Sequence, residues 1–247
     1  MNKLKNIYYF LKKILNKIVF FYASFIYKYF VYRFTVWYHK IKINYEWKYK
    51  NSEMVSYDHL NNLYLWQEFP EKVQFTISPA IARLYLKKND TVLDVSCGDG
   101  SISYLFFSDI AKNVDAFDIS EINIQKAKKN YTSKNLKYYC NSTLNFNYQE
   151  KMYDVIYWGA GIDYLSSEEI EQTIKKLRFT IKDSGNLIVK TVLSNVNSQL
   201  GPGMKTLFYD LENLFSFFEH AFKIEISKTS DYLVRKEVNI VFKPKIN

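Results

Sequence analysis

One segment of this 247-residue chain constrains its fold more than any other: residues 92–101, which read VLDVSCGDGS. An apolar run that contains an acid, Asp94, leads into a turn with two glycines, Gly98 and Gly100. Glycines let backbone N–H groups approach a ligand without a Cβ in the way. The segment is therefore typical of a buried strand that passes through a ligand-binding turn into a helix.

Strand-like and helix-like patterns alternate through the rest of the chain. Such alternation predicts a mostly parallel sheet with helices on both faces. The last two strands have no helix between them, which predicts an antiparallel pair that turns near residues 230–231. We therefore expect a doubly wound α/β fold with seven strands and a C-terminal antiparallel pair. The expected strands are 91–96, 113–119, 136–140, 153–158, 185–192, 222–227 and 237–243, and the expected helices are 78–88, 101–109, 121–131, 167–181 and 205–221.

The net charge of +9 comes from the N-terminal fifth of the chain. Residues 1–50 hold many lysines and a single acid, Glu46, whereas bases and acids balance in the remainder. Residues 4–43 contain no Pro or Gly and place a narrow basic stripe opposite a wide apolar, aromatic face. This pattern predicts an amphipathic helix, or two joined helices. We expect three parts: this segment at 1–43, a linker with short helices at 44–75, and one domain at 76–247.

The amphipathic segment has several interpretations. It can lie in a membrane interface, with its lysines near anionic lipid, or it can pack on the domain or on a second subunit. Its longest uncharged run, residues 18–27, is too short to cross a bilayer, unless Lys28 snorkels to the surface. RNA contact is less favoured because arginine, the residue best suited to phosphate, is scarce. No signal-peptide cleavage site follows, so we expect a cytoplasmic protein, peripheral on the inner membrane face where residues 4–43 bind lipid.

The acids around the glycine turn indicate which ligand it holds. Asp94 and Asp99 would repel a pyrophosphate, the usual ligand of a helix N-terminus, and favour a ligand with positive charge. Asp118 ends the next expected strand, where a carboxylate accepts hydrogen bonds from both ribose hydroxyls. S-adenosylmethionine carries a sulfonium, an ammonium and a ribose but no phosphate. The sequence therefore predicts this cofactor.

These motifs resemble those of the class I S-adenosylmethionine-dependent methyltransferases. In that family's first motif an acid is followed by Gly-x-Gly-x-Gly, and here Ser96 stands in place of the first glycine. Serine is small, so we expect the turn to form. The likeness covers about residues 75–245 and includes the final strand pair. It implies that Asp94 and the backbone of Ser96, Gly98 and Gly100 surround the methionine part of the cofactor, that Asp118 binds the ribose, that Ile119 packs on adenine, and that Asn141 or Ser142 contacts the adenine amino group.

The resemblance also makes residues 151–158 the family's fourth strand, whose end faces the transferred methyl group. Trp158 is then expected to stack on cofactor or substrate, with ordinary packing as the alternative. Asp163 is the best-placed general-base candidate, with a solvated loop acid as the alternative. The sulfonium is already activated, so alignment and exclusion of water are the protein's main tasks. A hydroxyl acceptor would still benefit from a base. No clear base stands out, and both O- and N-methylation stay open.

The loop after the fifth strand, residues 194–205, is long and polar. Loops at the carboxyl ends of strands bind ligands in this architecture. Its side chains suit a hydroxylated acceptor such as a sugar, and a solvated connector is the alternative. The candidate residues are Asn195, Asn197, Ser198 and Gln199.

Three functions follow from the sequence. The first is a methyltransferase for a small-molecule, glycan or lipid-linked acceptor, working at a membrane surface when residues 4–43 bind lipid. The second is an RNA methyltransferase, although no Asn-Pro-Pro-Tyr-type run is present and nucleic acid is not the expected partner. The third is a noncatalytic cofactor-binding or membrane-scaffold protein. Two cysteines and three scattered histidines argue against a disulfide framework or a metal site. The oligomeric state is open.

Overall fold

The computed structural model describes Val19, Tyr22 and residues 74–194, 200, 203–232 and 235–246. The backbone divides into two units, residues 1–51 and 52–247. In the first unit only Val19 and Tyr22 are described, and both are helical and exposed. The predictions for the rest of residues 1–43 and for 44–73 lie outside the described residues. Within the described residues, no helix combines the length and apolar character needed to cross a membrane.

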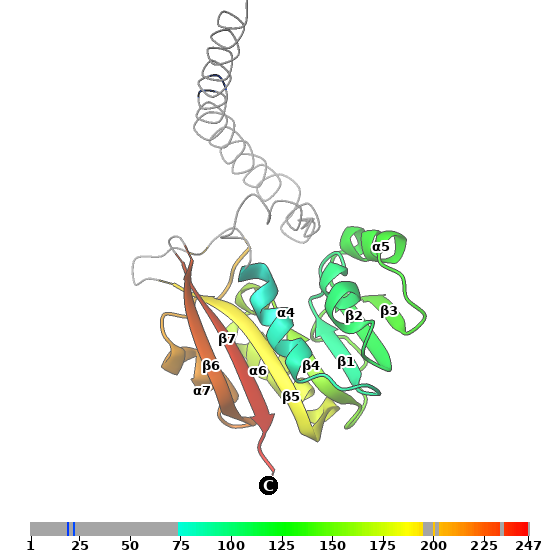
Figure 1. Cartoon of the computed structure of the whole chain (residues 1–247). Coiled ribbons are helices and arrows are strands. Elements are labelled where there is room, and N and C mark those ends of the chain that lie inside the picture. Colours follow the sequence, from blue (N-terminus) through cyan, green and yellow to red (C-terminus); the bar gives the residue numbers. More distant parts are fainter. Residues whose placement is uncertain are drawn as a thin grey trace, which may run out of the picture. The chain divides into compact units, whose positions relative to one another are not determined.

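The domain is built on a seven-stranded sheet in the order β3-β2-β1-β4-β5-β7-β6 (Figure 1). The first five strands pair in parallel, and β7 is antiparallel to both β5 and β6. The predicted fold class is therefore confirmed. The strands are β1 (Thr91–Val95), β2 (Asn113–Asp118), β3 (Leu136–Cys140), β4 (Tyr153–Trp158), β5 (Ile181–Leu193), β6 (Phe222–Tyr232) and β7 (Arg235–Pro244).

Helices pack on both faces of this sheet and divide the core into two clusters. On one face, α4 (Gln74–Leu84), the π-helix η4 (Ser103–Phe107) and α5 (Glu121–Asn130) cover β1 and its neighbours. On the other face, α6 (Ser167–Thr180) and α7 (Leu211–Phe218) cover a cluster rich in large aromatic and aliphatic side chains. A capping box at Ser166 begins α6, which starts at residue 167, where the sequence predicted it.

Several elements differ from the sequence-based expectation. Strand β5 begins at Ile181 rather than at residue 185, and β6 continues to Tyr232, so the turn expected near residues 230–231 lies further along the chain. Helix α4 begins at Gln74 rather than at Ser78, so Pro79 lies inside the helix and Ser78 is buried instead of capping it. The helix expected over 205–221 is confined to α7, because residues 204–209 are not helical and Phe208 bridges to Leu193 on β5. Asp210 caps α7 by accepting a hydrogen bond from the backbone N–H of Asn213 at 2.7 Å.

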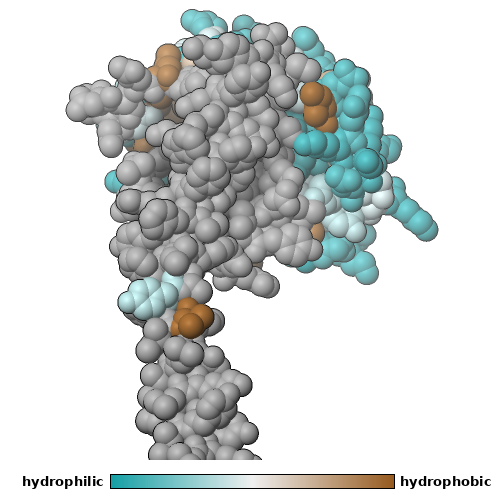
Figure 2. Space-filling model, turned by 90° about the horizontal axis from the view of Figure 1, so that it is seen from above, coloured by the Kyte–Doolittle hydropathy of each residue, from teal (hydrophilic) through white to brown (hydrophobic). Residues whose placement is uncertain are grey.

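The helix expected after the glycine turn is also different. Its central part is a π-helix in which the N–H of Ser108 donates to the carbonyl of Ser103. Such wide turns are concentrated at functional sites. On the face seen in Figure 2, the described surface is mainly hydrophilic, with hydrophobic residues in small separate patches.

Candidate active site

Asp94 is the first acid of the site and is almost completely buried on β1, with 1% of its surface exposed. Its Oδ2 accepts a hydrogen bond from the hydroxyl of Ser103 at 2.6 Å. Burial raises the pKa of Asp94 to about 7; the Ser103 hydrogen bond lowers it, and the nearby charge of Asp118 raises it further. A cation placed beside Asp94 would favour the ionised carboxylate.

The turn after Asp94 is held in left-handed backbone conformations. Ser96, Gly98 and Gly100 have φ values of 59°, 57° and 78°. Only glycine adopts this region without cost, so Ser96 carries backbone strain that the family's glycine would avoid. Gly100 has no room for a side chain, because an added Cβ would lie 2.5 Å from Cε1 of Tyr138. The turn therefore packs closely against Tyr138 at Gly100, where only a glycine fits.

Asp118, the acid at the end of β2, is tied to the same turn. One of its oxygens accepts the N–H of Gly98 at 3.0 Å, and the other accepts the N–H of Ser120 at 2.8 Å. Ser120 in turn caps α5. Asp118 thus links the glycine turn to the start of α5. Ile119, next along the chain, is 57% exposed. Its aliphatic side chain is therefore available to pack against a flat apolar group such as a base.

Asn141 and Ser142 follow β3 and are both half-buried. The N–H of Asn141 donates to the carbonyl of Asp118 at 2.9 Å, which places this turn directly beside the ribose-binding candidate. The side-chain oxygen of Asn141 accepts the N–H of Ser142, and the Ser142 hydroxyl accepts the N–H of Asn145. The turns that follow β1, β2 and β3 therefore lie next to one another along one edge of the sheet.

The two candidate residues at and after the end of β4, Trp158 and Asp163, differ in their burial. Trp158 is fully buried in the core with Leu93 and Val95, and its indole N–H has no hydrogen-bond partner. Its place in the structure is thus ordinary packing rather than stacking on an open surface. Asp163 lies in a short 3-10 helix, η5 (Ile162–Tyr164), and is half-buried. Its carbonyl accepts the N–H of Lys205 and of Thr206, at 2.9 and 3.1 Å.

Sequence reasoning missed several residues that shape the site. Gly161 has a φ of 89°, and a Cβ there would lie 2.9 Å from the hydroxyl of Ser96, so the β4 turn sits against the β1 turn. Tyr138 donates from its hydroxyl to the carbonyl of Gly100 at 3.1 Å. No local sequence motif predicts the Gly161–Ser96 contact or the Tyr138–Gly100 hydrogen bond, because each joins segments that are distant in the sequence. The loop candidates Asn195, Asn197, Ser198 and Gln199 lie outside the described residues.

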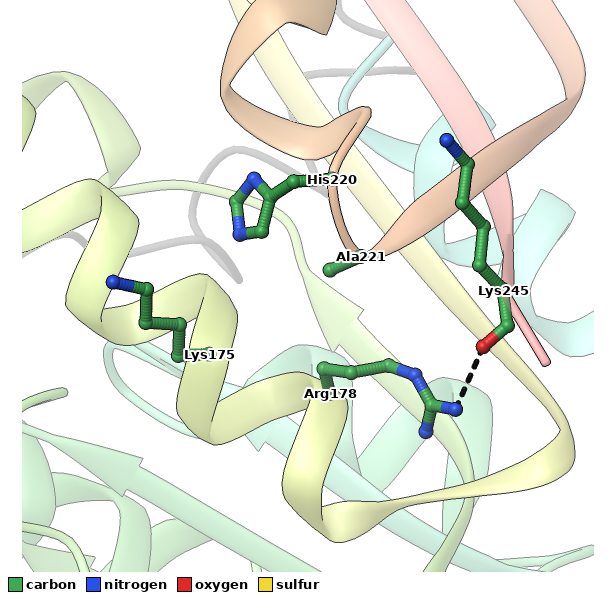
Figure 3. A pocket seen from close by; sticks show the side chains of 5 residues that line it. All are labelled: Lys175, Arg178, His220, Ala221 and Lys245. Carbon is green, nitrogen blue, oxygen red and sulfur yellow. Dashed lines mark hydrogen bonds between the residues drawn. The ribbon is translucent and has the colours of Figure 1, made fainter. Parts of the chain in front are cut away.

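Two cavities lined by described residues, of about 200 and 560 Å³, lie away from this edge of the sheet. Among the described residues, no group of three or more His, Cys, Asp or Glu side chains is placed to hold a metal ion. A cavity of about 200 Å³ lies elsewhere, lined by Lys175, Arg178, His220, Ala221 and Lys245 (Figure 3). In it, the guanidinium of Arg178 donates to the carbonyl of Lys245 at 2.7 Å. None of the glycine-turn residues contributes to it, so it is separate from the candidate site.

A family model described as a methyltransferase domain matches residues 92–185, the segment that contains all three turns. Residues 92–185 are therefore similar to methyltransferase domains, in agreement with the resemblance that the sequence motifs indicated. A search of curated protein sequences finds no match.

Solved structures with this methyltransferase fold are numerous but distant in sequence. A putative S-adenosylmethionine-dependent methyltransferase from Listeria monocytogenes aligns with a TM-score of 0.56 at 15% identity, over 68% of this chain and 97% of that one. The N-methyltransferase NodS from Bradyrhizobium japonicum WM9, in complex with S-adenosyl-L-homocysteine, gives 0.62 at 12% identity, over 72% and 90%. The [4+2]-cyclase SpnF gives 0.61 at 13% identity, over 80% and 85%.

The residues at this edge of the sheet fit S-adenosylmethionine as a cofactor. The carboxylate of Asp94 is buried and accepts a hydrogen bond from a neutral group, the Ser103 hydroxyl, so a cationic ligand would suit it. The exposed side chain of Ile119 offers an apolar surface beside the acid that ends β2. When bound, the cofactor supplies an activated methyl group. The protein's own residues supply charge, shape and hydrogen bonds around it.

Proposed function

We propose that this enzyme transfers a methyl group from S-adenosylmethionine to an oxygen or nitrogen atom of a small-molecule, glycan or lipid-linked acceptor. The observation that carries the proposal is the pairing of two carboxylates, Asp94 and Asp118, across one glycine turn at the carboxyl ends of β1 and β2. Carboxylates in these places suit an ammonium, a sulfonium and a ribose, and they oppose a phosphate. Asp94 binds the methionine end and Asp118 the ribose.

In this proposal, the remaining cofactor contacts follow the edge of the sheet. The backbone of Ser96, Gly98 and Gly100 surrounds the methionine part, Ile119 packs on adenine, and Asn141 or Ser142 meets the adenine amino group. Trp158 supports the site from the core beneath it. The acceptor nucleophile displaces the thioether in line, forming its bond to carbon as the carbon–sulfur bond breaks, and Asp163 receives the acceptor's proton when the nucleophile is a hydroxyl.

Binding and product formation test the proposal separately. Calorimetry with S-adenosylmethionine and S-adenosyl-L-homocysteine measures affinity. Asp94→Ala serves as the variant that lacks the carboxylate proposed to bind the cationic methionine end. Mass spectrometry then follows the added CH₂ on acceptor panels of sugars, lipids, amines and RNA. Absence of binding at millimolar cofactor would overturn the enzymatic function. Binding without product on every panel would favour a noncatalytic role, and salt-sensitive methylation of RNA would favour the second alternative.

We further propose that the protein is cytoplasmic and that residues 4–43 bind the inner face of the membrane. The support is the charge distribution, because the basic excess of the chain lies in its first 50 residues. A basic amphipathic helix is attracted to anionic lipid and buries its apolar face at the headgroup boundary. Flotation with vesicles containing phosphatidylserine should recover the full chain but not residues 44–247. Equal recovery of both would contradict the membrane role.

A further inference from the structure

A buried polar cluster lies on β5 and β7, on the same face of the sheet as α4. The ammonium of Lys190 is 3.4 Å from Oε2 of Glu237, and their side chains are only 11% and 8% exposed. Lys190 pairs directly with Asn239 across the antiparallel ladder, so Glu237 is its diagonal neighbour. Long side chains bridge such diagonals, which explains why the three groups meet.

The cluster carries an unsatisfied hydrogen-bonding group. Asn239 is 3% exposed, and its side-chain oxygen has no hydrogen-bond partner. A buried polar atom left without a partner lowers stability, and a buried ion pair is at best weakly stabilising. An apolar residue at this position would pack more favourably. A ligand that donates a hydrogen bond to Asn239 accounts for the arrangement.

The position of the cluster connects it to the cofactor site. Asp94, Tyr157 and Ile188 are successive partners across β1, β4 and β5, and Ile188 pairs with Val241 on β7. The next pair on the same face, toward the carboxyl end of β5, is Lys190 with Asn239. Burial raises the pKa of Tyr157, and the charges of both Asp94 and Glu237 raise it further. The phenol of Tyr157 therefore lies near enough to interact electrostatically with Asp94 at the glycine turn and with Glu237 in the cluster.

We propose that Lys190, Glu237 and Asn239 bind hydroxyl groups of an uncharged, hydroxylated methyl acceptor. This inference rests on the proposed function. A hydroxyl donates a hydrogen bond, so it satisfies the oxygen of Asn239 while it lies beside the Lys190–Glu237 pair. The pair is neutral as a unit, so it offers no net attraction for a phosphate or carboxylate. The cluster therefore selects acceptors such as neutral glycosides over their phosphorylated counterparts.

Nuclear magnetic resonance of side-chain amides tests this selection on the full chain saturated with S-adenosyl-L-homocysteine. The signal of Asn239 is assigned by its absence in Asn239→Leu. Methyl α-glucopyranoside should shift this signal saturably, and glucose 6-phosphate should require at least fivefold higher concentration for the same shift. No saturable shift with the glycoside, or an equal response to both probes, overturns the proposal.

A matched pair of variants separates binding from structure. Asn239→Leu should keep the affinity for S-adenosyl-L-homocysteine within twofold, hold or raise the melting temperature, and abolish glycoside shifts elsewhere in the spectrum. Asn186→Leu is the control: it removes another buried asparagine whose oxygen has no partner, at the other end of β5, and it should leave those shifts unchanged. A melting temperature lowered by several degrees in both Asn239→Leu and Asn239→Ala would make Asn239 structural and refute the inference.

If Asn239→Leu does not fold, Asn239→Ala provides the same comparison with a smaller side chain. The two proposals fail in different ways. Wild-type protein that ignores S-adenosyl-L-homocysteine refutes the proposed function. Wild-type protein that binds it while Asn239 ignores the glycoside refutes only the acceptor cluster.

Discussion

Replacing Asp94 by asparagine should stabilise the cofactor-free protein while removing its affinity for the cofactor. The carboxylate is 1% exposed, and its pKa is raised from 3.8 to about 7. At about 1.4 kcal/mol per tenfold change, this rise means that the ionised group costs roughly 4 kcal/mol of folding stability well above pH 7. Asparagine keeps the shape and cannot ionise, so it removes much of this penalty.

The direction with pH follows from the raised pKa. The folded protein holds the Asp94 proton more tightly than the unfolded chain, so the wild type loses stability as pH rises from about 4 through 7. Asp94→Asn lacks this loss. Its advantage should therefore be small at pH 4.5 and largest at pH 8, where about 4 kcal/mol corresponds to a melting temperature higher by on the order of 10 °C for a chain of this size.

Thermal melts of both proteins from pH 4.5 to 8, with calorimetric titration of S-adenosyl-L-homocysteine, measure both effects. Asp115→Asn is the matched control, since Asp115 is also buried but accepts hydrogen bonds from the hydroxyls of Tyr139 and Tyr153 at 3.1 and 3.0 Å. This control should lower stability and keep cofactor affinity. An Asp94→Asn protein that is less stable than wild type at pH 8, or that binds the cofactor equally well, would refute the reasoning.

Three further substitutions probe the edge of the sheet. Gly100→Ala places a Cβ against Tyr138 at a φ of 78°, so it should lower stability by about 1–3 kcal/mol in denaturant titration, and an unchanged midpoint would contradict the packing. Ser96→Gly relieves a left-handed residue and should preserve the melting temperature and cofactor affinity; a tenfold weaker affinity would show that the serine side chain itself binds. Asp118→Ala removes the acceptor for two backbone N–H groups and should weaken cofactor binding at least tenfold by calorimetry, whereas unchanged affinity would exclude it from the ribose site.

The sequence predicted the sheet because each β–α unit carries its own local signals. Alternating strands and helices and the helix-free final pair predicted a mostly parallel sheet with a C-terminal antiparallel pair, and the strand pairing confirms it. The start of α4 was misplaced because Pro79 suits a first turn, whereas the helix includes Gln74 and its Ser78 is buried rather than a cap.

The site was predictable only where one strand and its own turn carry the residues. Asp94, Gly98 and Asp118 belong to such local motifs. The partners that complete the arrangement are distant in sequence: Ser103 on the far side of the turn, Tyr138 on β3 and Gly161 after β4. The pairing of Lys190 with Glu237 depends on the ladder register between β5 and β7, which periodicity alone does not determine.

The two ends of the segment after β5 are fixed to the framework. Ser194 donates its N–H to the carbonyl of Phe208 at 2.7 Å, while Lys205 and Thr206 are held by the carbonyl of Asp163. The hydroxyl of Thr206 also donates to the carbonyl of Leu165 at 2.7 Å. Because loop closure depends only weakly on length once the ends are set, residues 195–202 can be exchanged for longer or shorter sequences with little effect on folding. Residues 195–202 can therefore vary, in evolution or in a designed library, independently of the turns that follow β1, β2 and β3.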